Sequence, residues 1–140
     1  MSWCEQMFHY RFKDDTLLET ALTHRSHSAN NNERLEFLGD AVLDLVISEL
    51  LYQFYSEQTE GSLSRMRSSL VKGDTLAVLA KELNLGDYLV LGKGENTSGG
   101  RERLSLLSNA LEAIIGAIFL DCLLYTSDAA DERSSVDLGG

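Results

Sequence analysis

Apolar residues recur at helical spacing through most of this chain. They define five amphipathic segments, separated by polar or glycine-containing stretches. No segment alternates apolar and polar residues for long, as a half-buried strand would. The pattern therefore predicts an all-α fold. The first expected helix carries Leu17 to Leu22 after a cap at Asp14 or Asp15, and the second runs from Asn32 to about Phe54. The third is capped by Ser62 or Ser64 and carries Leu63 to Val71. The fourth follows Asp74 and carries Leu76 to Leu83, and the fifth runs from about Leu106 to Leu123.

The connections between these helices differ in character. The polar stretch Ser26–Asn32 predicts a loop that leads into the second helix. Asn84–Gly92 predicts a short irregular or 3₁₀ connection. Gly94–Arg103 contains Gly94, Gly99 and Gly100 and therefore predicts a mobile loop.

The last part of the chain differs from the rest. The apolar periodicity stops after Leu123, and the residues from Ser134 to Gly140 are mostly small or polar. This segment resembles the translation of a sequencing adapter read through the end of a truncated gene, and the alternative is a natural disordered tail. We therefore assign residues 1–123 to a single domain and treat residues 124–140 as a non-native or disordered tail.

Three carboxylates lie on one face of the second expected helix. Glu33, Glu36 and Asp40 occupy positions i, i+3 and i+7 of an otherwise apolar run. Acids one turn apart repel each other by about 0.2–0.5 kcal/mol per pair. A cation held between them would turn that repulsion into binding, and magnesium prefers oxygen ligands of this kind. The spacing therefore predicts a magnesium site.

A structural interpretation competes for part of this set. Asn32 suits an N-cap, and the helix dipole favours acids in the first turn, so Glu33 alone is better explained structurally. The effect of the dipole fades beyond that turn and does not explain Asp40. Asp40 also follows Gly39, a residue that destabilises a helix interior and often marks the close approach of a backbone or ligand.

A further candidate lies on the last expected helix. Glu112 has apolar neighbours, where a charge is costly unless it is paired or bound to a metal. Asn109, one turn earlier, offers a neutral amide oxygen on the same side. The alternative is a buried ion pair between Glu112 and an arginine such as Arg34.

Composition limits the partners and the cell compartment that such a site could have. The formal net charge of −10 argues at face value against nucleic-acid binding, although bound metal ions would lower it. Basic residues also bunch at Arg65–Lys72 and at Lys93–Arg103. The two cysteines lack metal-ligand spacing, which favours a reduced, cytoplasmic compartment. The longest apolar stretch, Ala110–Leu124, is too short to span a bilayer, so no membrane partner is expected.

Five segments of the chain resemble the ribonuclease III family and occur in the family's order. The resemblance covers about Phe8 to Asp121, and five segments in the same order are far more specific than any one motif. The segments are Asn32 to Leu43, which looks like the family's signature motif, Ala21 to Ser26, Glu60-Gly61 with Leu63 to Arg67, Ser98 to Gly100, and Leu111 to Ala113 with Ile115 to Ala117.

The resemblance implies a homodimeric endonuclease that cuts double-stranded RNA with magnesium, for which manganese is a possible substitute. It leaves 5′-phosphate and 3′-hydroxyl ends. Asp40 and Glu112 match the catalytic carboxylates of the family, and both also match metal ligands, as does Glu36. Asn109 stands where the family frequently has Asp. An amide oxygen can still ligate a hard cation, so we expect weaker magnesium affinity rather than loss of activity.

The resemblance also implies roles outside the central ligands. Glu33 and Glu60 match supporting acids near the cleft, and Phe37 matches an aromatic that inserts into the partner subunit. Family enzymes of the bacterial type continue into a separate RNA-binding domain. We expect this chain to lack that domain and the closing helix of the nuclease domain, and therefore to bind RNA weakly.

The residue types fit phosphodiester hydrolysis without the resemblance. Two metal ions about 4 Å apart can activate water and stabilise charge on the attacking and leaving oxygens, and carboxylates hold such ions. No organic cofactor and no histidine or cysteine site is needed, so His24 is better explained by packing or hydrogen bonding.

The sequence therefore predicts a magnesium-dependent double-stranded-RNA endonuclease that acts in rRNA and mRNA processing. One alternative is a catalytically weakened dimeric RNA-binding or scaffold module of the same fold. Another is a short family member that acts on structured ribosomal RNA without a second domain.

Overall fold

The computed structural model describes the backbone of residues 2–137 and the side chains of residues 2–124. Across residues 2–137 there is no strand, only an isolated bridge between Thr23 and Val90, so the predicted all-α fold is confirmed. In chain order the elements are α1 (Trp3–Phe8), α2 (Asp15–Leu22), α3 (Glu33–Phe54), α4 (Glu60–Val71), α5 (Gly73–Glu82), the 3₁₀ helix η1 (Leu85–Tyr88), α6 (Lys93–Thr97), the 3₁₀ helix η2 (Gly100–Glu102) and α7 (Leu104–Asp137).

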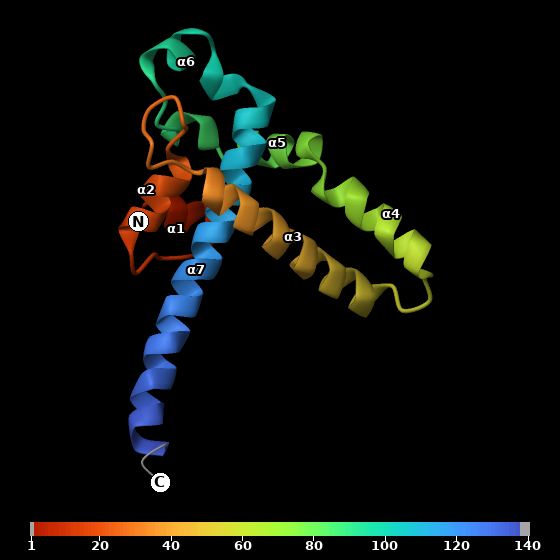
Figure 1. Cartoon of the computed structure of the whole chain (residues 1–140). Coiled ribbons are helices and arrows are strands. Elements are labelled where there is room, and N and C mark those ends of the chain that lie inside the picture. The colour runs from red at the N-terminus through yellow and green to blue at the C-terminus, as the bar shows by residue number, and fades with distance from the viewer. Residues whose placement is uncertain (1, 138–140) are drawn as a thin grey trace.

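Helix α7 forms the centre of the molecule, and α2, α3 and α5 pack against it (Figure 1). By length and composition the stretch Leu104–Leu124 could cross a membrane, but half of its most apolar window is buried inside the protein. This burial accounts for its apolar character as that of a core helix. The buried apolar positions of α7 are Leu107, Ala110, Leu111, Ala113, Ile114 and Ala117.

Helices α3 and α4 form an arm that extends away from the other helices (Figure 1). The amino-terminal part of α3 crosses α7, whereas its second half packs on α4, where Arg67 Nη1 donates a hydrogen bond to Ser48 Oγ over 2.9 Å. Helix α4 contributes no buried residue. The arm consequently leaves large apolar side chains of α3 in solvent, and Tyr52 and Phe54 are among the most exposed.

Three helix starts differ from the prediction. Helix α1 was not expected, and it begins after Ser2, whose Oγ accepts a hydrogen bond from Glu5 N. Helix α4 begins at Glu60 because Thr59 Oγ1 accepts from Ser62 N, so the expected caps at Ser62 and Ser64 are wrong. Helix α5 begins at Gly73, one residue before Asp74, with no side-chain cap at Lys72.

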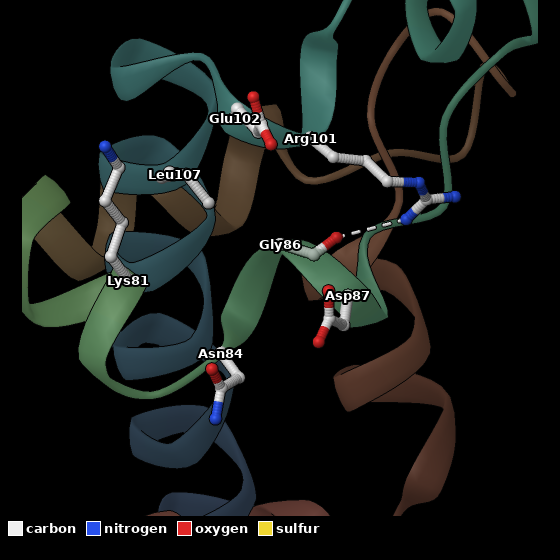
Figure 2. Close-up of a pocket in the computed structure, with 7 residues that line it drawn as sticks. All are labelled: Lys81, Asn84, Gly86, Asp87, Arg101, Glu102 and Leu107. Atoms are coloured by element: carbon white, nitrogen blue, oxygen red, sulfur yellow. Dashed lines mark hydrogen bonds between the residues drawn. The ribbon is translucent and has the colours of Figure 1, made fainter.

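The segment expected to be a mobile loop is instead folded into α6 and η2. Arg101 holds it in place: its Nη1 donates to the carbonyl oxygens of Gly86 (3.1 Å) and Leu89 (2.6 Å), and its Nε donates to Asn96 Oδ1 (2.8 Å). Figure 2 shows Arg101 reaching across to Gly86. The surrounding cavity, of about 490 Å³, is lined by Lys81, Asn84, Gly86, Asp87, Arg101, Glu102 and Leu107.

A buried carboxylate ties the amino-terminal segment to α7. Asp121 is 1% exposed, and its carboxylate accepts hydrogen bonds from Tyr10 Oη (2.5 Å), Lys13 N (2.9 Å) and Asp14 N (3.1 Å). Burial alone would raise the pKa of Asp121, but these hydrogen bonds hold it below the usual value. Asp121 is therefore ionised and structural in role.

Helix α7 continues past its expected end at Leu123 and runs to Asp137. No glycine or proline occurs between Leu124 and Asp137 to interrupt it. The division of the chain into a domain over residues 1–123 and a non-native or disordered tail over residues 124–140 stays a prediction.

Candidate functional site

The carboxylates of two helices meet where α3 crosses α7. Glu33, Glu36 and Asp40 from α3 and Glu112 from α7 line one cleft of about 480 Å³, together with Phe37. Four of the five predicted acids, which lie up to about eighty positions apart in the sequence, are thus brought together by the fold.

The acids of this cleft lie close together, and too little positive charge lies nearby to balance their negative charges. Burial raises the pKa of Glu112 to about 8, and hydrogen bonding with Asp40 and the negative charges of Asp40, Glu36 and Asp44 add to this effect. Burial also raises the pKa of Glu36, as do Glu33 and Asp40, while Arg25 acts in the opposite direction. A divalent cation would relieve this repulsion.

The predicted alternative for Glu112 is wrong. Arg34 is exposed, and among the described side chains it forms no ion pair with Glu112. The only cation that pairs with an acid of the cleft in this part of the chain is Arg25, whose Nη1 lies 3.9 Å from Glu33 Oε2, and both side chains are mostly exposed. Glu112 therefore faces carboxylates rather than an arginine.

The start of α3 is fixed differently from the prediction. Asn31 Oδ1, not Asn32, accepts a hydrogen bond from Glu33 N, over 3.0 Å. Asn32 is buried; its Nδ2 donates to Ala21 O (3.2 Å), and its backbone N–H donates to Thr23 O (2.9 Å). Asn32 thus ties the start of α3 to the end of α2, and the acids of α3 follow directly.

Two predicted residues do not line this cleft. Asn109 lies on α7 one turn before Glu112 and is half-buried, but it is absent from the lining, so its role as a ligand stays a prediction. Glu60 lies at the tip of the α3–α4 arm, where it lines a separate pocket of about 380 Å³ with Ser48 and Arg67. Within one chain, the fold does not bring Glu60 to the other acids.

His24 takes part in a hydrogen-bonded loop rather than in the cleft. Its Nδ1 accepts from Ser26 N over 3.1 Å and lies 2.8 Å from Ser26 Oγ. Ser26 Oγ in turn accepts from Gly92 N over 2.8 Å. These contacts agree with the structural role expected for His24.

The donor set of the cleft suits a hard divalent cation. All four acids offer oxygen ligands, and a bound cation would reduce the repulsion between them. Among the described side chains, no three acid, histidine or cysteine groups stand close enough together to form a finished metal site. Binding would therefore require the carboxylate side chains to rotate toward the ion.

An apolar surface begins beside the cleft. Phe37 is 81% exposed, and it lines both the carboxylate cleft and a neighbouring groove of about 900 Å³. Glu33 also lines both. The other lining residues of the groove are Leu17, Thr20, Asn30, Asn31, Arg34, Leu35, Leu38 and Leu120.

The chain matches the Ribonuclease-III-like family model over residues 14–130. It is 62% identical over 117 residues to Ribonuclease 3 of Shewanella amazonensis, which covers 84% of this chain and 52% of that protein. It is 53% identical over 135 residues to Ribonuclease 3 of Pseudomonas paraeruginosa, which covers 96% of this chain and 58% of that protein. The chain thus spans about half the length of these curated relatives.

A solved structure resembles the whole fold. The nuclease domain of ribonuclease III from Campylobacter jejuni superposes with a TM-score of 0.85 at 47% sequence identity, covering 94% of this chain and 93% of that one. That structure is described as showing flexibility in a region involved in dimer formation.

Proposed function

Because the chain belongs to the ribonuclease III family, we propose that it is an endonuclease domain that hydrolyses phosphodiester bonds of double-stranded RNA. The observation that carries the proposal is the meeting of Glu33, Glu36 and Asp40 with Glu112 in one open cleft. A core ion pair or a helix-dipole effect would not bring four acids together from two helices with only one exposed arginine, Arg25, paired at their edge.

The acids of the cleft have different roles, which follow from their surroundings. Glu36, Asp40 and Glu112 would hold magnesium, or manganese in its place, with Asn109 as a weaker neutral ligand. Bound divalent cations supply activation of water and stabilisation of the charge that develops on the attacking and leaving oxygens. Asp40 and Glu112, whose side chains are hydrogen-bonded to each other, serve as the catalytic carboxylates. Glu33, at the exposed rim, has a supporting role.

Selectivity for double-stranded RNA would come from shape and backbone contacts. A-form RNA is recognised mainly through its phosphates and 2′-hydroxyl groups across the minor groove, without reading of the bases. An open cleft on a helix crossing suits a rigid duplex better than a closed pocket would. The products would carry 5′-phosphate and 3′-hydroxyl ends, and we place the activity in cytoplasmic processing of rRNA and mRNA.

Exposed apolar side chains on α3 support a homodimer. Phe37, Leu45 and Tyr52 are each more than 65% exposed and lie within about a quarter of a turn of one another around this helix, which is unusual for large apolar side chains of a monomer. The groove next to Phe37 offers an apolar surface for the partner's Phe37. A dimer would bring two such clefts together on one duplex, so that each subunit could cut one strand.

Cleavage of a long RNA duplex tests the proposal. The full chain is incubated with the duplex, with and without magnesium, alongside Asp40→Asn and Glu112→Gln. The matched control is Asp87→Asn, which removes the same charge from an exposed position on η1. We expect magnesium-dependent cutting that either cleft variant abolishes and the control retains. Duplex binding without cutting, unchanged by either variant, would instead support the scaffold alternative.

A further inference from the structure

The backbones of α3 and α7 touch where Gly39 meets Gly116. A Cβ atom built at Gly39 would overlap the carbonyl oxygen of Glu112. A Cβ built at Gly116 would overlap the carbonyl oxygen of Leu35 and would lie 3.0 Å from Gly39 N. These neighbours are backbone atoms, which cannot rotate away as a side chain can. Neither glycine can therefore carry a side chain unless the two helices move apart.

This contact lies in register with the carboxylate cleft. Gly39 directly precedes Asp40, and Gly116 follows Glu112 by four residues, about one helical turn. The atom that Gly39 touches is the carbonyl oxygen of Glu112 itself. The distance between the helix axes at this point therefore sets the spacing of the backbone positions from which the Asp40 and Glu112 side chains extend.

Another helical glycine shows that such contact is not general in this fold. A Cβ at Gly61 on α4 would meet only Arg65 Nη1, at 3.4 Å, the end of a flexible side chain. Glycine destabilises a helix interior relative to alanine, so its presence at both positions of the α3–α7 crossing requires a compensating gain. Close approach of the two backbones provides it.

We propose that Gly116 is a positioning residue of the carboxylate cleft. Through its contact with Leu35 and Gly39, it fixes the spacing between Glu112 and Asp40 at which the cleft binds a divalent cation. This inference rests on the proposed function because the cation site is part of that function. Cation binding can nevertheless be measured without RNA.

The test compares Mn²⁺ affinity, by calorimetric titration of the full chain, in Gly116→Ala and two controls. Gly61→Ala introduces the same methyl group where there is room. Ile114→Val weakens the core of the same helix at a buried residue that is not among the atoms contacting Gly39 or Gly116. Loss of an outer support of a metal site typically costs about 10-fold to 100-fold in affinity, and we expect that loss in Gly116→Ala. Both controls should bind within about twofold of the wild type. Gly116→Ala binding as tightly as Ile114→Val would overturn the proposal.

A rescue experiment separates spacing from a general structural defect. Asp40→Glu lengthens one carboxylate arm by a methylene group. It should weaken Mn²⁺ binding in the wild-type background, where the helices are already in contact, and restore part of the affinity in Gly116→Ala. Simple addition of the two losses would refute a role in spacing.

If Gly116→Ala does not fold, as judged by circular dichroism, Glu112→Asp gives the answer in the wild-type background. The backbones already touch, so the helices cannot approach further to compensate for the shorter side chain. We expect affinity to fall by about 10-fold or more. Binding within about twofold of the wild type would overturn the proposal.

The two proposals fail in distinguishable ways. A wild-type chain that neither binds Mn²⁺ nor cuts RNA refutes both. A wild-type chain that binds Mn²⁺ and cuts RNA, while Gly116→Ala matches its controls, refutes only the positioning role.

Discussion

Replacing Glu112 by Gln should stabilise the metal-free protein at high pH. The folded state raises the pKa of Glu112 to about 8, from an ordinary value of 4.5, because burial and the charges of Asp40, Glu36 and Asp44 oppose its ionisation. Below pH 4.5 the group is neutral in both the folded and the unfolded chain. Between these values the unfolded chain loses a proton that the folded chain keeps. Stability therefore falls as the pH rises, and the loss is complete above about pH 8.

The size of this effect follows from the difference between the two pKa values. At about 1.4 kcal/mol per pH unit, the full difference corresponds to about 5 kcal/mol. Glu112 is only half-buried in an open cleft, so screening by water reduces the expected effect to about 1–2 kcal/mol. Gln has nearly the same shape as a protonated Glu and avoids the cost of ionisation.

Urea unfolding in the presence of EDTA measures the effect. At pH 9, Glu112→Gln should be more stable than the wild type by about 1–2 kcal/mol, and at pH 5 most of that difference should vanish. Asp87→Asn, which removes an exposed acid, serves as the charge-matched control. With excess Mg²⁺ the order at pH 9 should reverse, because only the wild type gains from tight binding. A variant that is no more stable than the wild type at pH 9 without metal would refute the reasoning.

Three other substitutions test separate parts of the structure. Asp121→Ala should lower the free energy of unfolding by about 3 kcal/mol in urea at pH 7, because it strands the hydrogen-bond donors of Tyr10, Lys13 and Asp14; a loss below about 1 kcal/mol would contradict the assigned anchoring role. The lowered pKa of Asp121 also predicts that its contribution is present above pH 3.8 and is lost as the pH falls through the lower, folded-state value. Phe37→Ala should convert a dimer to a monomer in sedimentation experiments and change monomer stability by only about 0.5 kcal/mol; an unchanged sedimentation coefficient would count against the proposed interface. Asn109→Asp should lower the magnesium concentration needed for half-maximal cleavage, and an unchanged metal dependence would remove Asn109 from the ligand set.

The sequence predicts α3 and the core of α7 well because their apolar residues repeat over many turns. It fails at α6 and η2, where glycine and polar residues predict a mobile loop. Their order depends on Arg101, which donates hydrogen bonds to Gly86 and Leu89 from at least a dozen residues away. A local pattern contains no sign of such a partner. The same limit explains Asn32, whose side chain bonds to Ala21 instead of capping its own helix.

For the site, helical spacing alone places Glu36 and Asp40 on one face, but it cannot show which distant segment lies opposite. The apolar neighbours of Glu112 single it out as a candidate, the resemblance to a family assigns it to the same site, and the structure brings it to the same cleft. Glu60 shows the limit of the resemblance. A matching motif does not give the distance between residues, and Glu60 lies at the tip of the arm, away from the other acids. In the sequence, Gly39 alone indicated the meeting point, because a glycine inside a helical run often marks close approach. The structure shows that Gly39 touches α7 beside Gly116, a glycine that the sequence pattern did not single out.

The position of Phe37 links the cleft to the apolar face of α3. Phe37 lies between Glu36 and Asp40 in sequence and lines both the carboxylate cleft and the apolar groove. Glu33 does the same, so the two surfaces share residues on one rigid helix. If a partner subunit covers Phe37, it also removes water from one wall of the cleft, and a lower local dielectric strengthens the attraction between the carboxylates and a cation. Cation affinity should therefore be higher in the dimer than in the monomer, and by linkage the cation should favour dimer formation to the same extent. Sedimentation of the wild-type chain with and without Mn²⁺ measures this coupling, and a dimerisation constant that does not change with Mn²⁺ would show that the two surfaces are adjacent but independent.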